Sequence, residues 1–135
     1  MDIRKFAVEE TGVLELLGAS DEPLLDESKK PITVTLYGPG SKQYAKAQAA
    51  QSNRMIDKLK KKGKSDQSAD ERARETAEFL AACTKDFSDN LEYGDLQGEA
   101  LHRAVYSDVT LGFISEQVNK YLSDWGNFSQ RSTTN

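Results

Sequence analysis

The residue types that most often carry catalytic or metal chemistry are scarce in this 135-residue sequence. It contains one cysteine, Cys83, and one histidine, His102. A single cysteine excludes an intramolecular disulfide, and the two residues are too few for a zinc site with more than two cysteine or histidine ligands. Cys83 lies at an apolar position of a helical pattern, so we expect a small core residue. His102 lies in the helical-looking stretch GEALHRAVY, and we expect it at the surface or half-buried.

The sequence gives no support for nucleophilic or acid–base catalysis. A Ser-His-Asp triad would have to use His102, but the sequence contains no nucleophile elbow of the G-x-S-x-G type. Two carboxylate pairs lie among Asn, Ser and Gly residues typical of loops: Asp86 with Asp89, and Glu92 with Asp95. Nothing indicates the apolar pocket that would separate the pKa values of an acid and a base. We therefore expect no catalytic residue, no metal, no cofactor and no enzyme activity.

Residues 38–42 (GPGSK) separate a strand-like pattern from a helix-like pattern, as a phosphate-binding loop does. A Walker A loop has Gly directly before its Lys and Ser or Thr directly after it, whereas here Ser41 precedes Lys42 and Gln43 follows. The loop is also too short to surround a triphosphate with backbone N–H groups, although one anion could rest at the helix start. We interpret the glycines as turn residues and Ser41 as a helix N-cap.

The charge balance limits the possible partners. The chain has 22 acidic and 18 basic residues and a net charge of −4, so it has no general attraction for nucleic acid or an anionic membrane. No apolar run approaches the roughly 18 residues of a membrane span, and the N-terminal MDIRKFAVEE lacks the apolar stretch of a signal peptide. We expect a soluble, cytoplasmic protein without a membrane partner. Its length fits one domain over residues 1–128, followed by a flexible polar tail over 129–135.

The patterning predicts an α+β fold that is mostly helical. A small antiparallel β region is expected over about residues 3–37, and three or four helices over about 41–125. The clearest strand is 32–37 (ITVTLY), whose strict alternation places Val34 and Leu36 on one face. The glycines and the proline that follow this strand end it.

The helical region begins with a long segment rich in Ala, Lys, Gln and Met, from Ser41 to about Lys62. Ser68 and Glu71 then have the S-x-x-E spacing of a capping box, which indicates the start of a second helix. Apolar positions recur every three or four residues from there to Phe87. We therefore expect the second helix to continue to that residue.

Two shorter helices are expected after a polar loop. The first covers about residues 97–106, and the second covers about 111–124 with an apolar stripe that ends at Leu122 and Trp125. Phe128 follows closely enough to fold back against Trp125. Helices would then supply most of the core.

Charge is distributed unevenly along the chain. Residues 6–28 hold seven acidic side chains and no basic one, whereas residues 54–64 hold six basic side chains and one acidic, Asp57. If the two patches lie on different faces, one subunit's acidic region can approach the next subunit's basic helix end in a head-to-tail contact. If they lie together, they neutralise each other within one chain. The sequence leaves both arrangements open, and the first predicts a weak homo-oligomer.

The same basic helix end, residues 54–64, suggests a small nucleic-acid-binding regulator. It contains no aromatic residue that could stack on a base, and it shows no helix-turn-helix spacing. Cations at a helix C-terminus are also favoured by the helix dipole alone. Nucleic acid is therefore the less favoured partner.

Three segments resemble the tail assembly chaperones of long-tailed, siphovirus-like bacteriophages and prophages: 34–55 (VTLYGPGSKQYAKAQAAQSNRM), 77–87 (AEFLAACTKDF) and 105–128 (VYSDVTLGFISEQVNKYLSDWGNF). The resemblance implies a non-catalytic factor in the bacterial cytoplasm that keeps the tape measure protein soluble during tail tube assembly. Such a factor is absent from the mature virion. The resemblance also implies a longer, frameshifted form whose extension recruits the tail tube protein. A structural tail component, such as a tube or connector protein, is the alternative.

A chaperone that binds an aggregation-prone client needs an adjustable apolar surface of its own. The Ala-rich helix is the candidate, because small residues permit close helix approach and methionine repacks easily. Ordinary packing within the chain is the other interpretation of this face. The predicted partner-binding or self-association surface consists of Ala45, Ala49, Met55, Ile56, Leu59, Lys58, Lys60, Lys61 and Lys62.

Overall fold

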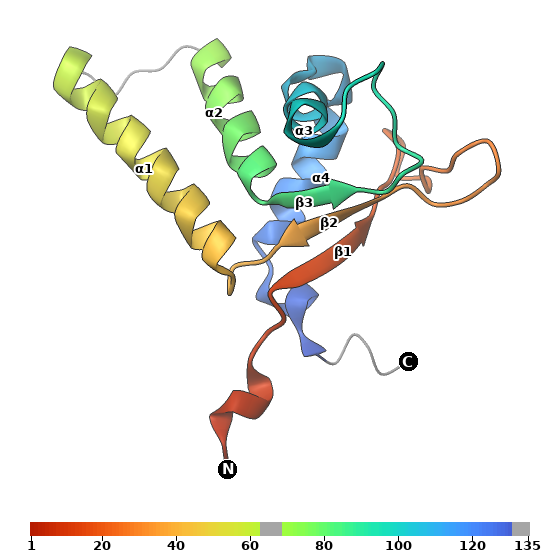
Figure 1. Ribbon diagram of the computed structural model, residues 1–135, viewed down its shortest axis with the longest axis horizontal. Coiled ribbons are helices and arrows are strands. Elements are labelled where there is room, and N and C mark those ends of the chain that lie inside the picture. Colours follow the sequence, from red (N-terminus) through yellow and green to blue (C-terminus); the bar gives the residue numbers. More distant parts are fainter. Residues whose placement is uncertain (63–68, 131–135) are drawn as a thin grey trace.

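The computed structural model describes residues 1–62 and 69–130 and has the predicted α+β fold. Figure 1 shows the strands at the centre, α2 and α3 beyond the β3 edge, and α1 on the outer flank of α2. The strands are β1 (Thr11–Glu15), β2 (Thr33–Tyr37) and β3 (Thr84–Phe87), and the helices are α1 (Lys42–Lys62), α2 (Ala69–Ala82), α3 (Gly98–Ser107) and α4 (Gly112–Leu122). Short 3-10 turns lie at Ile3–Phe6, Val109–Leu111 and Trp125–Phe128.

The sheet is antiparallel with the order β1-β2-β3. β2 is the central strand, and the predicted alternation is confirmed there, because Val34 and Leu36 are fully buried while the other three residues of the strand are half-buried. A side-chain period of two puts these two residues on the face that meets the helices. The largest fully buried side chains are Phe128, Leu16, Leu36, Leu80, Leu122, Val34, Val105, Val118 and Cys83.

The prediction that the second helix continues to Phe87 is wrong. α2 ends at Ala82, and Thr84–Phe87 forms the third strand of the sheet. Thr84 and Phe87 are both buried, and their three-residue spacing imitated a helical stripe. A register irregularity in the pairing of β2 with β3 accompanies this pattern. The free edge of β2 needs backbone partners, and this tertiary demand overrides the helical pattern.

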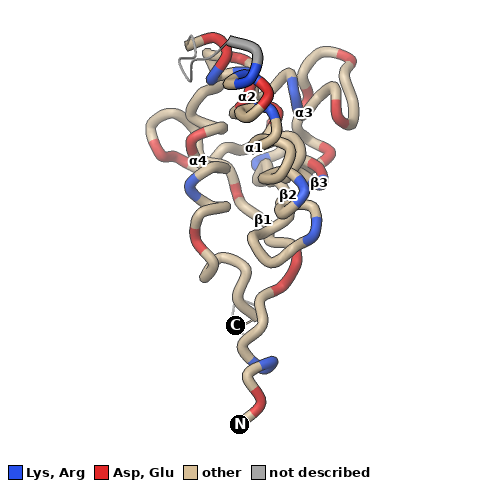
Figure 2. Tube along the Cα trace, turned by 90° about the vertical axis from the view of Figure 1, so that its left-hand side faces the viewer, with Lys and Arg blue, Asp and Glu red and all other residues tan. Residues whose placement is uncertain are grey.

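The N-terminal residues are not part of the sheet. β1 begins only at Thr11, and the apolar Ile3 and Phe6 before it are exposed. Figure 2 shows this segment extending away from the rest of the molecule. The β region expected from residue 3 therefore starts later, and its third strand comes from β3.

Local capping fixes where α1 begins. The Ser41 hydroxyl accepts a hydrogen bond from the Tyr44 backbone N–H at 3.1 Å and donates one to the Gly38 carbonyl at 2.7 Å. This confirms Ser41 as the N-cap, which satisfies one of the orphan amides of the first turn. The capping box expected at Ser68 lies outside the described residues.

The C-terminal part of the chain closes the core differently from the expectation. Phe128 is buried, but its ring packs edge-on against Tyr121 at a centroid distance of 5.2 Å. Trp125 is 57% exposed, so neither its predicted place in the apolar stripe nor its contact with Phe128 is found. Beside the ring of Phe128, Gly12 and Gly38 have no Cβ, and one built there would overlap it.

Residues 129 and 130, the first two of the predicted tail, make hydrogen bonds to the rest of the chain. Gln130 donates a hydrogen bond from its Nε2 to the Ala7 carbonyl at 2.7 Å, and the Glu9 backbone N–H donates to the Phe128 carbonyl at 2.7 Å. These bonds join the segment just before β1 to the last described residues. Residues 131–135 of the expected tail lie outside the described part. None of the described helices combines the length and the hydropathy that crossing a membrane requires.

Candidate functional site

One face of α1 packs against α2, and that face is mostly polar. Its members recur every three or four residues: Tyr44, Ala47, Gln51, Arg54 and Lys58. Ala47 is buried and the other four are half-buried. At the N-terminal end of α1, which we call its base, Tyr44 contacts Phe79 of α2 edge-on, with ring centroids 5.6 Å apart. Toward the C-terminal end of α1, the contact with α2 is made by polar side chains.

The far half of the interface between α1 and α2 is held by ion pairs. Lys58 Nζ lies 2.6 Å from Glu75 Oε1 and 3.0 Å from Glu71 Oε2. The carboxylates of Glu75 and Glu71 raise the pKa of Lys58, because they stabilise its charged form. Lys58 was predicted to belong to the partner-binding surface. Instead, its charge is directed inward and satisfied within the chain.

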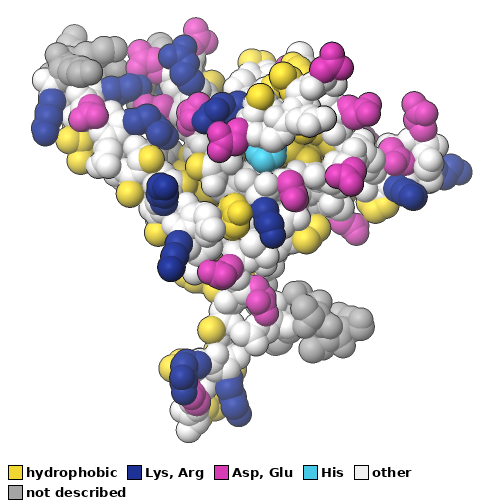
Figure 3. Space-filling model, in the orientation of Figure 1, with side chains coloured by type: hydrophobic (Ala, Val, Ile, Leu, Met, Phe, Trp, Pro, Cys, Tyr) yellow, Lys and Arg dark blue, Asp and Glu magenta, His cyan; other side chains and the backbone are white. Residues whose placement is uncertain are grey.

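The exposed face of α1 carries a stripe of residues that are apolar except for one serine, Ser52. Steps of four and three residues connect Ala45, Ala49, Ser52, Ile56 and Leu59, and all five are exposed. Ile56 is 48% exposed and Leu59 is 43% exposed. We call these five residues, together with the neighbouring Met55, the α1 stripe. Figure 3 shows hydrophobic side chains along α1, where they are open to solvent.

This arrangement reverses the usual amphipathic helix, whose apolar stripe faces the core. Alternating steps of three and four residues are the spacing of a coiled-coil seam, so the α1 stripe has the geometry to receive another helix. Small residues, Ala45 and Ala49, lie toward the base and allow close approach of a partner backbone. Larger side chains, Ile56 and Leu59, lie toward the end, where they can fill gaps on the partner surface.

The structure places the predicted surface residues as follows. All five apolar candidates lie on the exposed side of α1, and Lys60 is exposed beside them. The side chains of Lys61 and Lys62 lie outside the described part. The sequence did not reveal which face of the helix would be free. The available signal was the second, polar series that ends at Lys58, because α2 carries two carboxylates, Glu71 and Glu75, that can pair with this lysine.

The single thiol has no reactive character. Cys83 is fully buried, and burial raises its pKa to about 12. A thiol with such a pKa stays protonated and is a poor nucleophile at neutral pH. The prediction that Cys83 is a core residue is confirmed.

His102 is buried, so the expectation of a surface or half-buried position is wrong. Only 5% of the residue is exposed, and its ring packs edge-on against Phe87 with centroids 5.5 Å apart. Its Nδ1 is buried without a hydrogen-bond partner among the described residues. Within those residues, no group of three His, Cys, Asp or Glu side chains is arranged to hold a metal ion.

Burial of His102 makes stability depend on pH. Desolvation lowers the pKa of His102 from its ordinary 6.5, and the carboxylates of Asp86 and Glu99 oppose this only in part. The unfolded chain therefore binds the proton more readily, so stability falls as the pH drops below about 6.5. We expect the urea midpoint to decrease between about pH 7 and about pH 5.5. The variant His102→Leu should lose this part of the slope, and an unchanged slope would assign it to other groups.

Protein-family models, curated proteins and solved structures were compared with this chain. None of them matches it. The candidate site is therefore the exposed face of α1, where side chains with coiled-coil spacing remain exposed although the opposite face is packed.

Proposed function

We propose that this protein is a phage tail assembly chaperone that binds the tape measure protein through the α1 stripe. The observation that carries the proposal is the reversed amphipathicity of α1, with Ile56 and Leu59 exposed and Lys58 directed inward. The segment resemblance described above supplies the identity of the client. Binding of this kind needs no catalytic group.

The physical basis is burial of apolar surface on both partners. A long helical client with apolar surface aggregates unless that surface is covered, and each Å² of apolar area removed from water contributes about 25 cal/mol. One α1 stripe is short, so each contact is weak. Many subunits along one client would give high avidity while each subunit stays displaceable by tail tube protein. As the resemblance implies, the protein would act in the host cytoplasm and be absent from the virion.

The two alternatives make different predictions. A structural tail component would remain in the particle, so protein identification in purified virions separates it from a chaperone. A nucleic-acid-binding regulator would need the cations of residues 54–64 to be free. Lys58 is already paired with Glu71 and Glu75, which argues against that function.

Coexpression with the tape measure protein tests the proposal. The gene immediately downstream is the candidate client if it encodes a long, helix-rich chain, and a slippery site at the end of this gene would mark the frameshifted form. We expect the client to remain in the supernatant when both proteins are produced and to precipitate when it is produced alone. Equal precipitation in both cultures, with this protein itself folded and abundant, would contradict the proposal.

A further inference from the structure

A cavity of about 720 Å³ lies between β3, the loop that follows it and the first turns of α3. Four carboxylates line it: Asp86, Asp89, Glu92 and Asp95. None of them forms an ion pair with a described residue. The positive contributions are one lysine, Lys85, and the dipole at the start of α3, which equals about half an elementary charge. The cavity therefore carries a net negative charge, which attracts a cationic ligand.

The lining of this cavity includes a buried nitrogen without a partner. His102 lines the cavity and is 5% exposed, and its Nδ1 makes no hydrogen bond to a described residue. In Figure 3 part of the histidine side chain, in cyan, is visible among acidic side chains. Burial lowers the pKa of His102, so the imidazole is neutral near pH 7 and one of its nitrogens can accept a hydrogen bond. An unpaired buried acceptor is costly, and a ligand that donates to it removes that cost.

The rest of the lining suits an aliphatic chain. Phe87 is buried with its ring packed against that of His102, and an aromatic face attracts cations. Three leucines, Leu91, Leu96 and Leu101, also line the cavity and can cover methylene groups. Among the described residues, no three acidic or histidine side chains are grouped closely enough to hold a metal ion. The negative charge is therefore spread out, and it matches a ligand whose positive charges are spaced along a chain.

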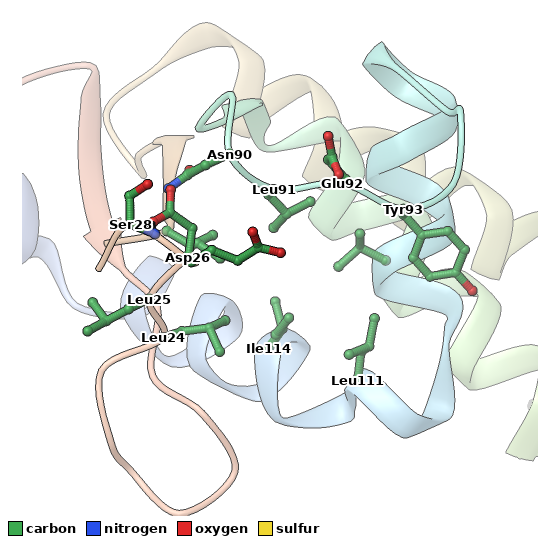
Figure 4. A pocket seen from close by; sticks show the side chains of 13 residues that line it. Leu24, Leu25, Asp26, Ser28, Asn90, Leu91, Glu92, Tyr93, Leu111 and Ile114 are labelled. Carbon is green, nitrogen blue, oxygen red and sulfur yellow. Dashed lines mark hydrogen bonds between the residues drawn. The ribbon is translucent and has the colours of Figure 1, made fainter. Parts of the chain in front are cut away.

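A neighbouring cavity of about 640 Å³ lacks these features. Figure 4 shows its lining, which shares Glu92 with the first cavity. Its Asp26 already accepts hydrogen bonds from the backbone N–H groups of Ser28 and Lys30, at 2.8 and 2.9 Å. Among the described residues that line it, no side-chain nitrogen or oxygen is buried without a partner. Only the cavity beside β3 combines excess carboxylates with an unpaired acceptor.

We propose that the cavity beside β3 binds a linear aliphatic polyamine, a chain of methylene groups that carries ammonium groups at intervals. One ammonium group donates a hydrogen bond to Nδ1 of His102, the methylene groups lie against Phe87 and the leucines, and the other ammonium groups pair with the carboxylates. Nδ1 is shut off from solvent in the free protein, so the imidazole rotates slightly about its Cβ–Cγ bond, a torsion with a broad energy well. This inference does not depend on the proposed function.

Isothermal titration calorimetry with spermidine tests the site. We expect saturable, one-to-one binding that weakens as salt is added. The double variant Asp86→Asn, Asp95→Asn should bind about fivefold more weakly, because it removes two ion pairs with the ligand. The control Glu10→Gln, Glu116→Gln loses the same two charges outside the cavity and should bind as the wild type does. All four residues are exposed, so both variants should fold, as circular dichroism would verify.

The imidazole nitrogens can be observed separately by NMR, because the chain contains a single histidine. Spermidine should shift the Nδ1 resonance of the wild-type protein, and His102→Leu should bind spermidine about tenfold more weakly. The proposal is overturned if spermidine does not bind, if the Nδ1 resonance stays unchanged, or if the control variant loses as much affinity as the cavity variant. It is equally overturned if magnesium ions or the peptide trilysine bind as tightly as spermidine, since the site would then not select a polyamine.

Discussion

The double variant Ile56→Glu, Leu59→Glu is expected to bind the tape measure protein much more weakly than the wild type and to keep its fold. Both side chains are nearly half exposed in the free protein. Only this exposed part becomes buried against a partner, so the two side chains together contribute on the order of 2 kcal/mol, and affinity should fall at least about thirtyfold. The substitutions lie on the solvent side, so the unfolding free energy should change by less than about 0.5 kcal/mol. Pull-down of coexpressed client and urea denaturation measure the two effects.

A matched control comes from the same helix. Ala50→Glu with Asn53→Glu introduces the same two charges at the same three-residue spacing, on exposed residues outside the α1 stripe. This control should bind the client as the wild-type protein does. If both double variants lose the client equally, added negative charge is the cause, and the stripe is not the binding surface.

Replacement of Phe128 by alanine should have the largest effect on stability. The ring is 1% exposed and packs against Tyr121, over the strand ends at Gly12 and Gly38. Removal of a buried phenylalanine costs about 3–5 kcal/mol, because the apolar transfer energy is lost and a cavity remains. That is a large fraction of the about 5–15 kcal/mol by which domains are stable. Urea denaturation followed by circular dichroism measures the loss.

The neighbouring Trp125 provides the comparison for Phe128. It belongs to the same 3-10 turn, yet it is 57% exposed. Trp125→Ala should therefore cost less than about 1 kcal/mol. Equal losses from the two variants would mean that the tryptophan also packs in the core, as the sequence pattern suggested.

Where local sequence patterns agree with the tertiary packing, the structure confirms the prediction made from the sequence. The alternation of β2 placed Val34 and Leu36 in the core, and the hydroxyl of Ser41 marked the start of α1. Both features depend on residues that are close in sequence. The order of helices and the α+β class followed from signals of this kind.

The predictions that the structure contradicts concern residues whose packing partners are distant in sequence. β3 was read as helix because only the exposed edge of β2, about 50 residues earlier, requires a strand there. Phe128 packs over Gly12 and Gly38, and neither glycine signals this contact in the sequence. Burial of His102 likewise depends on Phe87, which belongs to the strand that was missed.

The orientation of α1 is the most consequential of these cases. Hydrophobicity alone would turn Ile56 and Leu59 toward the core. In the structure Lys58 instead pairs with Glu71 and Glu75 of α2, and Ile56 and Leu59 lie on the solvent side of the helix. Ion pairs that face each other across two helices are not visible in either helix alone. Of the nine residues predicted to form a partner-binding surface, the five apolar ones are exposed and Lys58 is paired within the chain, and their binding role stays a prediction.

Site-specific photocrosslinking tests the central claim most directly. A benzophenone amino acid would replace Ile56 in one protein and Asn53 in another, and each would be coexpressed with the tape measure protein and irradiated. We predict a crosslink to the client from position 56 and little or none from position 53. A client that stays soluble but crosslinks equally from both positions, or only from position 53, would contradict the claim that the α1 stripe holds it.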